Sequence, residues 1–137
     1  MISTVVALPF HETNDSADLT TATALHVNLA TNDNQVVHDY PFDDPGAVVA
    51  IVVRVETAAG TDHKSTFTPK INGAAELDGA VELGANDIKG YKEFDKSVLP
   101  LVRGDTIGMQ IVQDAAAATA PGNIEVIVYV QVGRSET

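Results

Sequence analysis

Ile124-Glu125-Val126-Ile127-Val128-Tyr129-Val130-Gln131-Val132 is the most regular segment of the chain. Its even-numbered residues are all Ile or Val, and its odd-numbered residues are Glu125, Ile127, Tyr129 and Gln131. Side chains on a β-strand point alternately to its two faces. The segment therefore predicts a strand with one face in a core, because the apolar positions of an amphipathic helix recur every three to four residues instead.

Other segments show the same alternation and predict further strands. One row is Val49, Ile51, Val53 and Val55, with Val48, Ala50 and Val52 opposite; another is Thr21, Thr23, Leu25, Val27 and Leu29, backed by Ala22, Ala24, His26 and Asn28; a third is Ile107, Met109 and Ile111. Weaker candidates are Thr4 to Phe10, Gln35 to Tyr40, Ser65 to Ile71, Ala80 to Leu83 and Tyr91 to Leu99. We expect a single all-β domain over residues 1–137, an antiparallel β-sandwich or jelly roll of about eight strands.

Turn sequences separate nearly all of these strands. They are Asn32-Asp33-Asn34, Asp44-Pro45-Gly46, Ala59-Gly60-Thr61-Asp62, Asn72-Gly73, Arg103-Gly104-Asp105 and Pro121-Gly122-Asn123. Helical turns fit only two segments, Gly84 to Lys89 and Asp114 to Ala120. Neither is long enough for a helix that packs as a layer of its own.

Composition excludes several classes of protein. The chain has no Cys and no Trp, so disulfides and zinc thiolates do not stabilise it. Its net charge is −11, which disfavours binding to nucleic acid. The longest apolar run, Ala47 to Val53, is far shorter than a membrane helix, and no export signal is visible, so we expect a soluble protein.

Residues that could carry chemistry do not form a recognisable site. The histidines His11, His26, His38 and His63 show no metal-binding spacing. Asp43 and Asp44, and Asn14 with Asp15 and Asp18, do not match a calcium loop, and no serine lies in a nucleophile motif. We therefore expect no catalytic, cofactor or metal site, and no enzyme.

Two glycine patterns also point to structure. Gly73, Gly79, Gly84, Gly104 and Gly108 lie in no phosphate-binding loop. Arg103-Gly104-Asp105 spells the tripeptide that integrins recognise, but a Gly-Asp pair just before a strand is also a common turn. We interpret it as a turn.

The second half of the chain resembles the closing strands of small virion jelly rolls in tailed phages. The resemblance is carried by Leu99-Pro100-Leu101-Val102-Arg103-Gly104-Asp105-Thr106-Ile107-Gly108-Met109-Gln110-Ile111, by Ile124 to Val132, and by the hairpin-like Phe67-Thr68-Pro69-Lys70-Ile71-Asn72-Gly73. The same pattern is similar to tumour-necrosis-factor-like and C1q-like heads, which usually contain more aromatic residues. A phage virion protein is thus the favoured family.

The resemblance implies a non-enzymatic capsid decoration protein that stabilises the phage head. Its expected partners are the major capsid protein and two further copies of itself, as a homotrimer on the capsid surface, made in the host cytoplasm, with no nucleic acid, membrane or cofactor. The alternative is the receptor- or glycan-binding head of a tail or capsid fibre. The sequence shows no fibre shaft ahead of the domain, which favours decoration.

Overall fold

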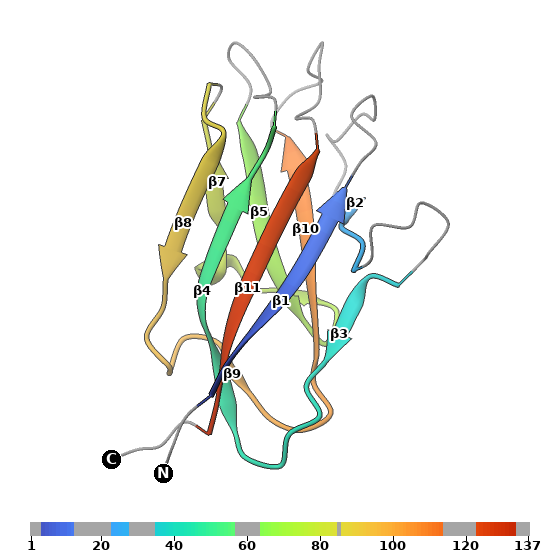
Figure 1. Ribbon diagram of the computed structural model, residues 1–137, viewed down its shortest axis with the longest axis vertical. Coiled ribbons are helices and arrows are strands. Elements are labelled where there is room, and N and C mark those ends of the chain that lie inside the picture. The colour runs from blue at the N-terminus through green and yellow to red at the C-terminus, as the bar shows by residue number, and fades with distance from the viewer. Residues whose placement is uncertain are drawn as a thin grey trace.

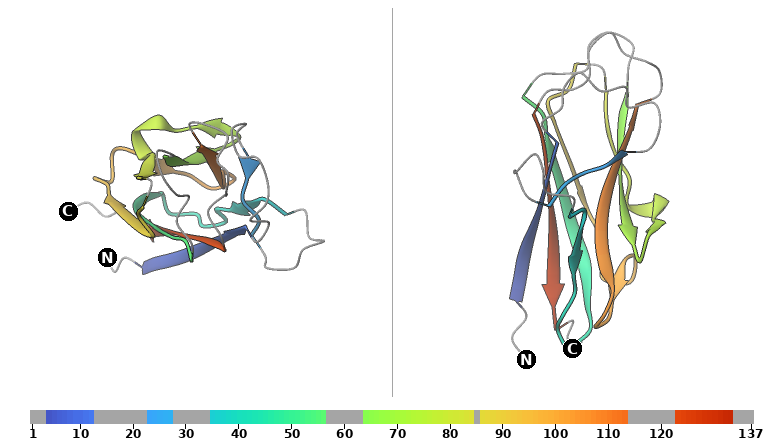
Figure 2. Two further views of the ribbon diagram at one scale, coloured as in Figure 1. Left: turned by 90° about the horizontal axis from the view of Figure 1, so that it is seen from above. Right: turned by 90° about the vertical axis from the view of Figure 1, so that its right-hand side faces the viewer.

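The computed structural model describes residues 4–12, 23–27, 35–56, 64–84, 86–113 and 123–133. Strands in this part of the chain form two antiparallel sheets that pack face to face (Figures 1 and 2). The helical element among the described residues is one 3-10 turn, η1 (Leu77–Gly79), which the sequence did not predict. The all-β prediction is confirmed.

The first sheet contains the beginning and the end of the described chain. Its order is β1 (Thr4–Glu12), β11 (Ile124–Val132), β4 (Gly46–Arg54) and β8 (Lys89–Glu93), with β9 (Pro100–Leu101) beside the start of β4. The predicted strand over residues 124–132 therefore lies in the middle of this sheet, between β1 and β4.

The second sheet is centred on β10 (Thr106–Gln113) and β5 (Ser65–Ile71). Its shorter strands are β2 (Thr23–Ala24) and β3 (Val37–Asp39) beside β10, and β6 (Ala74–Ala75) and β7 (Val81–Leu83) beside β5. Along the chain, groups of one to three successive strands alternate between the two sheets, as in a jelly roll. Eight of the eleven described strands are three residues or longer, in agreement with the predicted eight.

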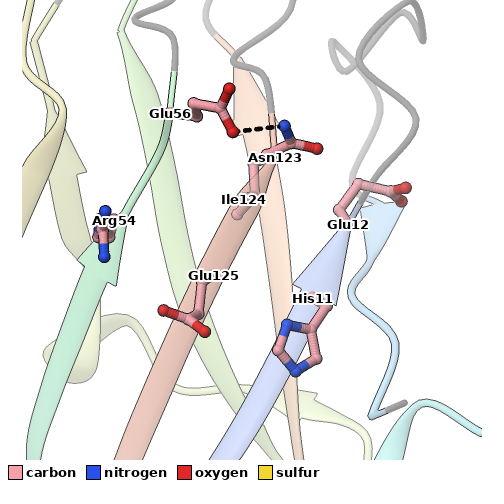
Figure 3. Close-up of a pocket in the computed structure, with 7 residues that line it drawn as sticks. All are labelled: His11, Glu12, Arg54, Glu56, Asn123, Ile124 and Glu125. Atoms are coloured by element: carbon pink, nitrogen blue, oxygen red, sulfur yellow. Dashed lines mark hydrogen bonds between the residues drawn. The ribbon is translucent and has the colours of Figure 1, made fainter. Parts of the chain in front are cut away.

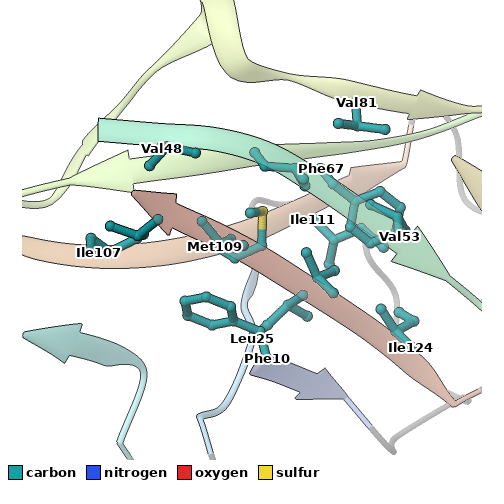
Figure 4. Close-up of a cluster of buried hydrophobic side chains, with 14 of the residues drawn as sticks. Phe10, Leu25, Val48, Val53, Phe67, Val81, Ile107, Met109, Ile111 and Ile124 are labelled. Carbon is teal, nitrogen blue, oxygen red and sulfur yellow. The ribbon is translucent and has the colours of Figure 1, made fainter. Parts of the chain in front are cut away.

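The core fills the space between the sheets (Figure 4). The even-numbered residues Ile124 to Val130 of β11 are buried, as the alternation predicted. Buried residues of β10 and β5 belong to the same core. Further buried residues come from the segments between the strands. The largest fully buried side chains are Tyr40, Phe10, Phe67, Leu25, Ile51, Leu99, Leu101, Ile107, Met109, Ile111 and Val48.

One predicted row is wrong at its start because the sheet contains a bulge. The sequence placed Val49 in the same row as Ile51 and Val53, with Val48 opposite. In the structure Val48 is buried and Val49 only half-buried, because the register shifts between Tyr129 and Val130. One extra residue on a bulged strand reverses the alternation beyond it.

The strand predicted from Tyr91 to Leu99 is also wrong in extent. The structure ends β8 at Glu93 and places a turn after it. The Asp95 carboxylate accepts hydrogen bonds from the backbone N–H and the hydroxyl of Ser97, at 3.1 and 3.0 Å, and the carbonyl of Asp95 accepts one from the N–H of Val98. Such a side-chain turn competes with the strand ladder.

Two further predictions have mixed outcomes. In the row from Thr21 to Leu29, Leu25 and Val27 are buried as predicted, but the regular strand is only β2. Gly84 begins a turn, not a helix, in which its N–H bonds the Asp87 carboxylate. The predicted turns at Asn32 to Asn34 and Ala59 to Asp62, and the helical candidate Asp114 to Ala120, lie outside the described residues.

The Asn72-Gly73 turn is confirmed. Both residues have positive φ, 54° and 84°, and they join Ile71 directly to Ala74 in a two-residue hairpin. Positive φ at both positions is the geometry that best matches the twist of paired strands.

Within the described residues, no helix has the length and apolar character needed to cross a membrane.

Candidate functional site

The outer face of the first sheet, turned away from the second sheet, carries rows of side chains that run across the strands. The strand registers define three rows: His11, Glu125, Arg54 and Lys89; Pro9, Ile127, Val52 and Tyr91; and Ala7, Tyr129, Ala50 and Glu93. The first row is ionisable, the second is apolar across the full width of the sheet, and the third is mostly apolar. We call the second and third rows, without Glu93 and with Val5, the outer band.

The outer band is accessible to a partner. Val5 and Tyr91, at its two edges, are 57% and 59% exposed, and Ile127, Tyr129 and Val52 between them are half-buried. Contiguous exposed apolar surface of this kind marks interaction sites in soluble proteins. Partial loss of hydration and the neighbouring Glu93 carboxylate raise the pKa of the Tyr91 hydroxyl, so this phenol stays neutral and can donate a hydrogen bond.

The ionisable row borders the outer band on one side. Glu125 lies opposite His11 on β1 and opposite Arg54 on β4, and Arg54 lies opposite Lys89 on β8. Glu125 and Arg54 have opposite charges and attract each other across the strands, whereas Arg54 and Lys89 repel each other. The outer face thus combines an apolar area with a charged border, as protein interfaces commonly do.

A hollow lies at this end of the first sheet (Figure 3). Its volume is about 270 Å³, and its lining is His11, Glu12, Arg54, Glu56, Asn123, Ile124 and Glu125. The side-chain amide of Asn123 donates a hydrogen bond of 2.7 Å to the carboxylate of Glu56. Among these described residues there is no Ser, Thr, Cys or Lys to act as a nucleophile, whereas three carboxylates, a guanidinium and an amide offer hydrogen bonds to a polar ligand.

Hydrogen bonds of His11, His26 and His38 connect β1 of the first sheet to segments at the edge of the second sheet. The backbones of His11 and His26 exchange two hydrogen bonds, of 2.7 and 2.9 Å. The imidazole Nε2 of His38 donates to the carbonyl of Pro9 at 2.8 Å, and its ring meets the Phe10 ring edge-on at 5.0 Å. His63 lies outside the described residues.

The carboxylate candidates are also engaged locally or lie outside the described residues. Asp43 forms an ion pair with Arg103, and the carbonyl of Asp44 accepts a hydrogen bond from the Tyr40 hydroxyl. Asn14, Asp15 and Asp18 are not among the described residues. Within the part of the chain that is described, no group of three or more His, Asp or Glu side chains is placed to hold a metal ion.

The Arg103-Gly104-Asp105 sequence forms a turn, as we interpreted it. Gly104 has a φ of 95°, and the Asp105 carboxylate accepts hydrogen bonds from the N–H of Val102 at 2.8 Å and from the side-chain amide of Asn72 at 2.9 Å. Both carboxylate oxygens are therefore used inside the fold. The tripeptide closes the connection into β10 and does not present a free carboxylate.

The sequence predicted only part of the outer band. Alternation in residues 124–132 placed Ile127 and Tyr129 on the second face of their strand, but their neighbours Pro9 and Val52 depend on strand order and register. Four strands from the two ends and the middle of the chain contribute to each row. No local pattern links them.

No protein-family model matches the sequence, and no curated protein resembles it in sequence. Similar solved structures include a CBM36-1 domain of a multidomain xylanase from the hindgut metagenome of Trinervitermes trinervoides (12% identity, 99% of this chain and 100% of that chain, TM-score 0.41). Others are murine APRIL (13%, 90% and 98%, TM-score 0.44) and Desmodium yellow mottle tymovirus (11%, 96% and 88%, TM-score 0.36). At these identities and TM-scores, the similarities carry no information on function.

Proposed function

We propose that this chain is a non-enzymatic capsid decoration protein of a phage head, and that the outer band is its contact with the major capsid protein. The observation that carries the proposal is the apolar row of Pro9, Ile127, Val52 and Tyr91, which crosses β1, β11, β4 and β8. A jelly roll needs only its inner faces to fold, so a second apolar face is available for a partner.

The residue types of the outer band and its border are those of a typical protein interface. Tyr129 and Tyr91 supply large side chains with a polar tip, which are frequent in the central contacts of interfaces. The ionisable row beside them sets orientation more than affinity. Each copy that bridges neighbouring capsid subunits adds its binding energy to the folded shell, so the shell becomes more resistant to heat.

The test uses expanded shells that lack the protein. Purified protein is added, the shells are imaged, and their heat resistance is measured. We expect binding at regular sites and a higher disruption temperature, with no requirement for the protein during shell assembly. Irregular or absent binding contradicts the proposal.

A pair of variants separates the outer band from the rest of the surface. Ile127→Glu places a charge in the middle of the apolar row, and we expect it to reduce shell binding at least tenfold, which corresponds to about 1.4 kcal/mol. Val112→Glu is the matched control, because Val112 is also half-buried but belongs to the second sheet. Equal loss in both variants argues against the outer band.

The hollow at the end of the first sheet favours a second function, that of a receptor- or glycan-binding fibre head. Its carboxylates, the Arg54 guanidinium and the Asn123 amide are groups that bind sugar hydroxyls. Binding of the protein to host glycans, lost in Arg54→Ala and retained in Ile127→Glu, is the result that selects this function over decoration.

A further inference from the structure

The outward edge of β1 has backbone groups that point away from its own sheet. The carbonyl of Pro9 accepts a hydrogen bond from His38, and His11 exchanges two with His26, so both residues direct their backbone groups away from β11. Residues two apart on a strand direct these groups to the same side. Val5 and Ala7 therefore do the same.

No described residue pairs with the N–H and C=O groups of Val5 and Ala7. β1 bonds to β11 along its other side, and the partners at the outward side reach only Pro9 and His11. Both residues are exposed, and β1 lies at the outside of the molecule in Figure 2. Each copy thus offers two donors and two acceptors on one open edge.

The two edges of the first sheet differ in charge. The opposite edge strand, β8, has Lys89, Lys92 and Glu93 among its five residues, whereas Thr4 to Leu8 of β1 has no charge. Charged side chains on an edge strand prevent pairing with another chain. The β8 edge is protected in this way and the β1 edge is not.

We propose that β1 pairs antiparallel with β1 of a second copy, about a two-fold axis at Val6. This register sets Val5 of each copy opposite Ala7 of the other. Their N–H and C=O groups then form four hydrogen bonds, which satisfy the open backbone groups of Val5 and Ala7 in both copies.

Neighbouring registers leave groups unpaired. A register centred on Ala7 sets Val5 opposite Pro9 of the second copy, and Pro9 has no N–H and a carbonyl already bonded to His38. A register centred on Val5 joins, among the described residues, only Val5 to its own equivalent. The register centred on Val6 is the one that the edge itself selects.

The pairing joins the five-stranded first sheets of the two copies into one continuous sheet. Antiparallel pairing keeps Val5 and Ala7 of both copies on the same face, so the two outer bands lie side by side on one surface. The contact is isologous and closes at two copies, which gives a dimer in place of the homotrimer implied by the sequence resemblance. The dimer does not depend on the proposed function, because its test measures mass and not capsid binding.

The first experiment is light scattering of the purified chain and two proline variants. We expect 28.8 kDa for the unaltered protein, twice the chain mass of 14.4 kDa. Ala7→Pro removes an outward N–H without touching the ladder to β11, and should return the mass to 14.4 kDa. Glu93→Pro makes the same change on the β8 edge, where the N–H of Phe94 and not of Glu93 bonds β4, and should remain a dimer.

The second experiment tests the register and does not rely on a proline. Because the chain has no Cys, Val6→Cys introduces a single thiol. Val6 faces its own equivalent in a non-hydrogen-bonded pair, whose Cα atoms lie about 4.5 Å apart and permit a disulfide. Under mild oxidation we expect a disulfide-linked dimer from Val6→Cys and much less from Val5→Cys.

A mass of 14.4 kDa for the unaltered protein at all concentrations, or a trimer mass, overturns the proposal. So does a dimer that persists in both Ala7→Pro and Val5→Lys, or equal cross-linking of the two cysteine variants. If Ala7→Pro fails to fold, Val5→Lys provides the same test, because the Val5 side chain is exposed.

Discussion

The hydroxyl group of Tyr40 occupies the space in which a side chain on Gly46 would lie. Tyr40 is 2% exposed, and its hydroxyl donates a hydrogen bond of 2.7 Å to the carbonyl of Asp44. A Cβ on Gly46 would also collide with the backbone carbonyl of Gln131. The absence of a side chain at Gly46 therefore lets the chain enter β4 directly beneath a buried aromatic ring.

Gly46→Ala should lower the free energy of unfolding by about 1–3 kcal/mol, because the added methyl group cannot be accommodated without moving the backbone of Gln131. Gly108→Ala is the control, since the nearest atom to its added Cβ is 3.4 Å away. We expect Gly108→Ala to be neutral or to stabilise by about 0.5–1 kcal/mol, as for Gly to Ala in a strand. Chemical denaturation of both variants measures the difference, and equal losses contradict this account.

The two charged residues of the turn at residues 103–105 should contribute differently to the free energy of unfolding. Asp105→Ala removes the acceptor for Val102 and Asn72, and should destabilise the fold by about 1.5–3 kcal/mol. Arg103→Ala removes only an exposed ion pair with Asp43 and should cost less than about 1 kcal/mol. A larger loss for Arg103→Ala than for Asp105→Ala in thermal or chemical unfolding contradicts the turn interpretation.

The Asp95 carboxyl should titrate below the 3.8 of an unperturbed aspartate. Hydrogen bonds from the Ser97 backbone N–H and, second, from its hydroxyl lower the pKa. Because the folded-state pKa lies below the unfolded one, the resulting stabilisation is present above pH 3.8 and is lost as the pH falls through the folded pKa. Nuclear magnetic resonance of the carboxyl carbon measures this titration.

Ser97→Ala should return the pKa of Asp95 only part of the way, since the backbone hydrogen bond remains. Lys96→Gln should change it less, because the charge of Lys96 has the smallest effect. An unshifted pKa in the unaltered protein, or a larger change in Lys96→Gln than in Ser97→Ala, is the opposing result.

Removal of divalent metal ions should leave the melting temperature unchanged. Any ion that bound the folded state alone would stabilise it in proportion to the logarithm of its concentration. Melting curves with a chelator and with added calcium test this expectation. A drop on chelation that calcium reverses would point to Asp15, Asp18, Asp43 and Asp44.

Local sequence predicted the strands better than it predicted the surface they form. The burial of Ile124, Val126 and Val128 follows from alternation, and the Asn72-Gly73 hairpin follows from the backbone preferences of those two residues. The displacement of Val49 could not be predicted, because a bulge depends on two strands together. The apolar row across Pro9 and Tyr91 likewise needs the order of four strands, which no single segment specifies.

The position of β11 also determines when the fold can form. β11 follows all the other described strands in the sequence and lies between β1 and β4, so β1 and β4 cannot be joined in the first sheet until β11 has left the ribosome. Contacts between distant segments form slowly, and Thr4 to Leu8 of β1, which carry no charge, stay unpaired during that interval. Synthesis in the cell thus exposes a strand that is prone to aggregation, and a peptide copy of residues 124–132 supplied in trans should compete for the place that this strand takes last.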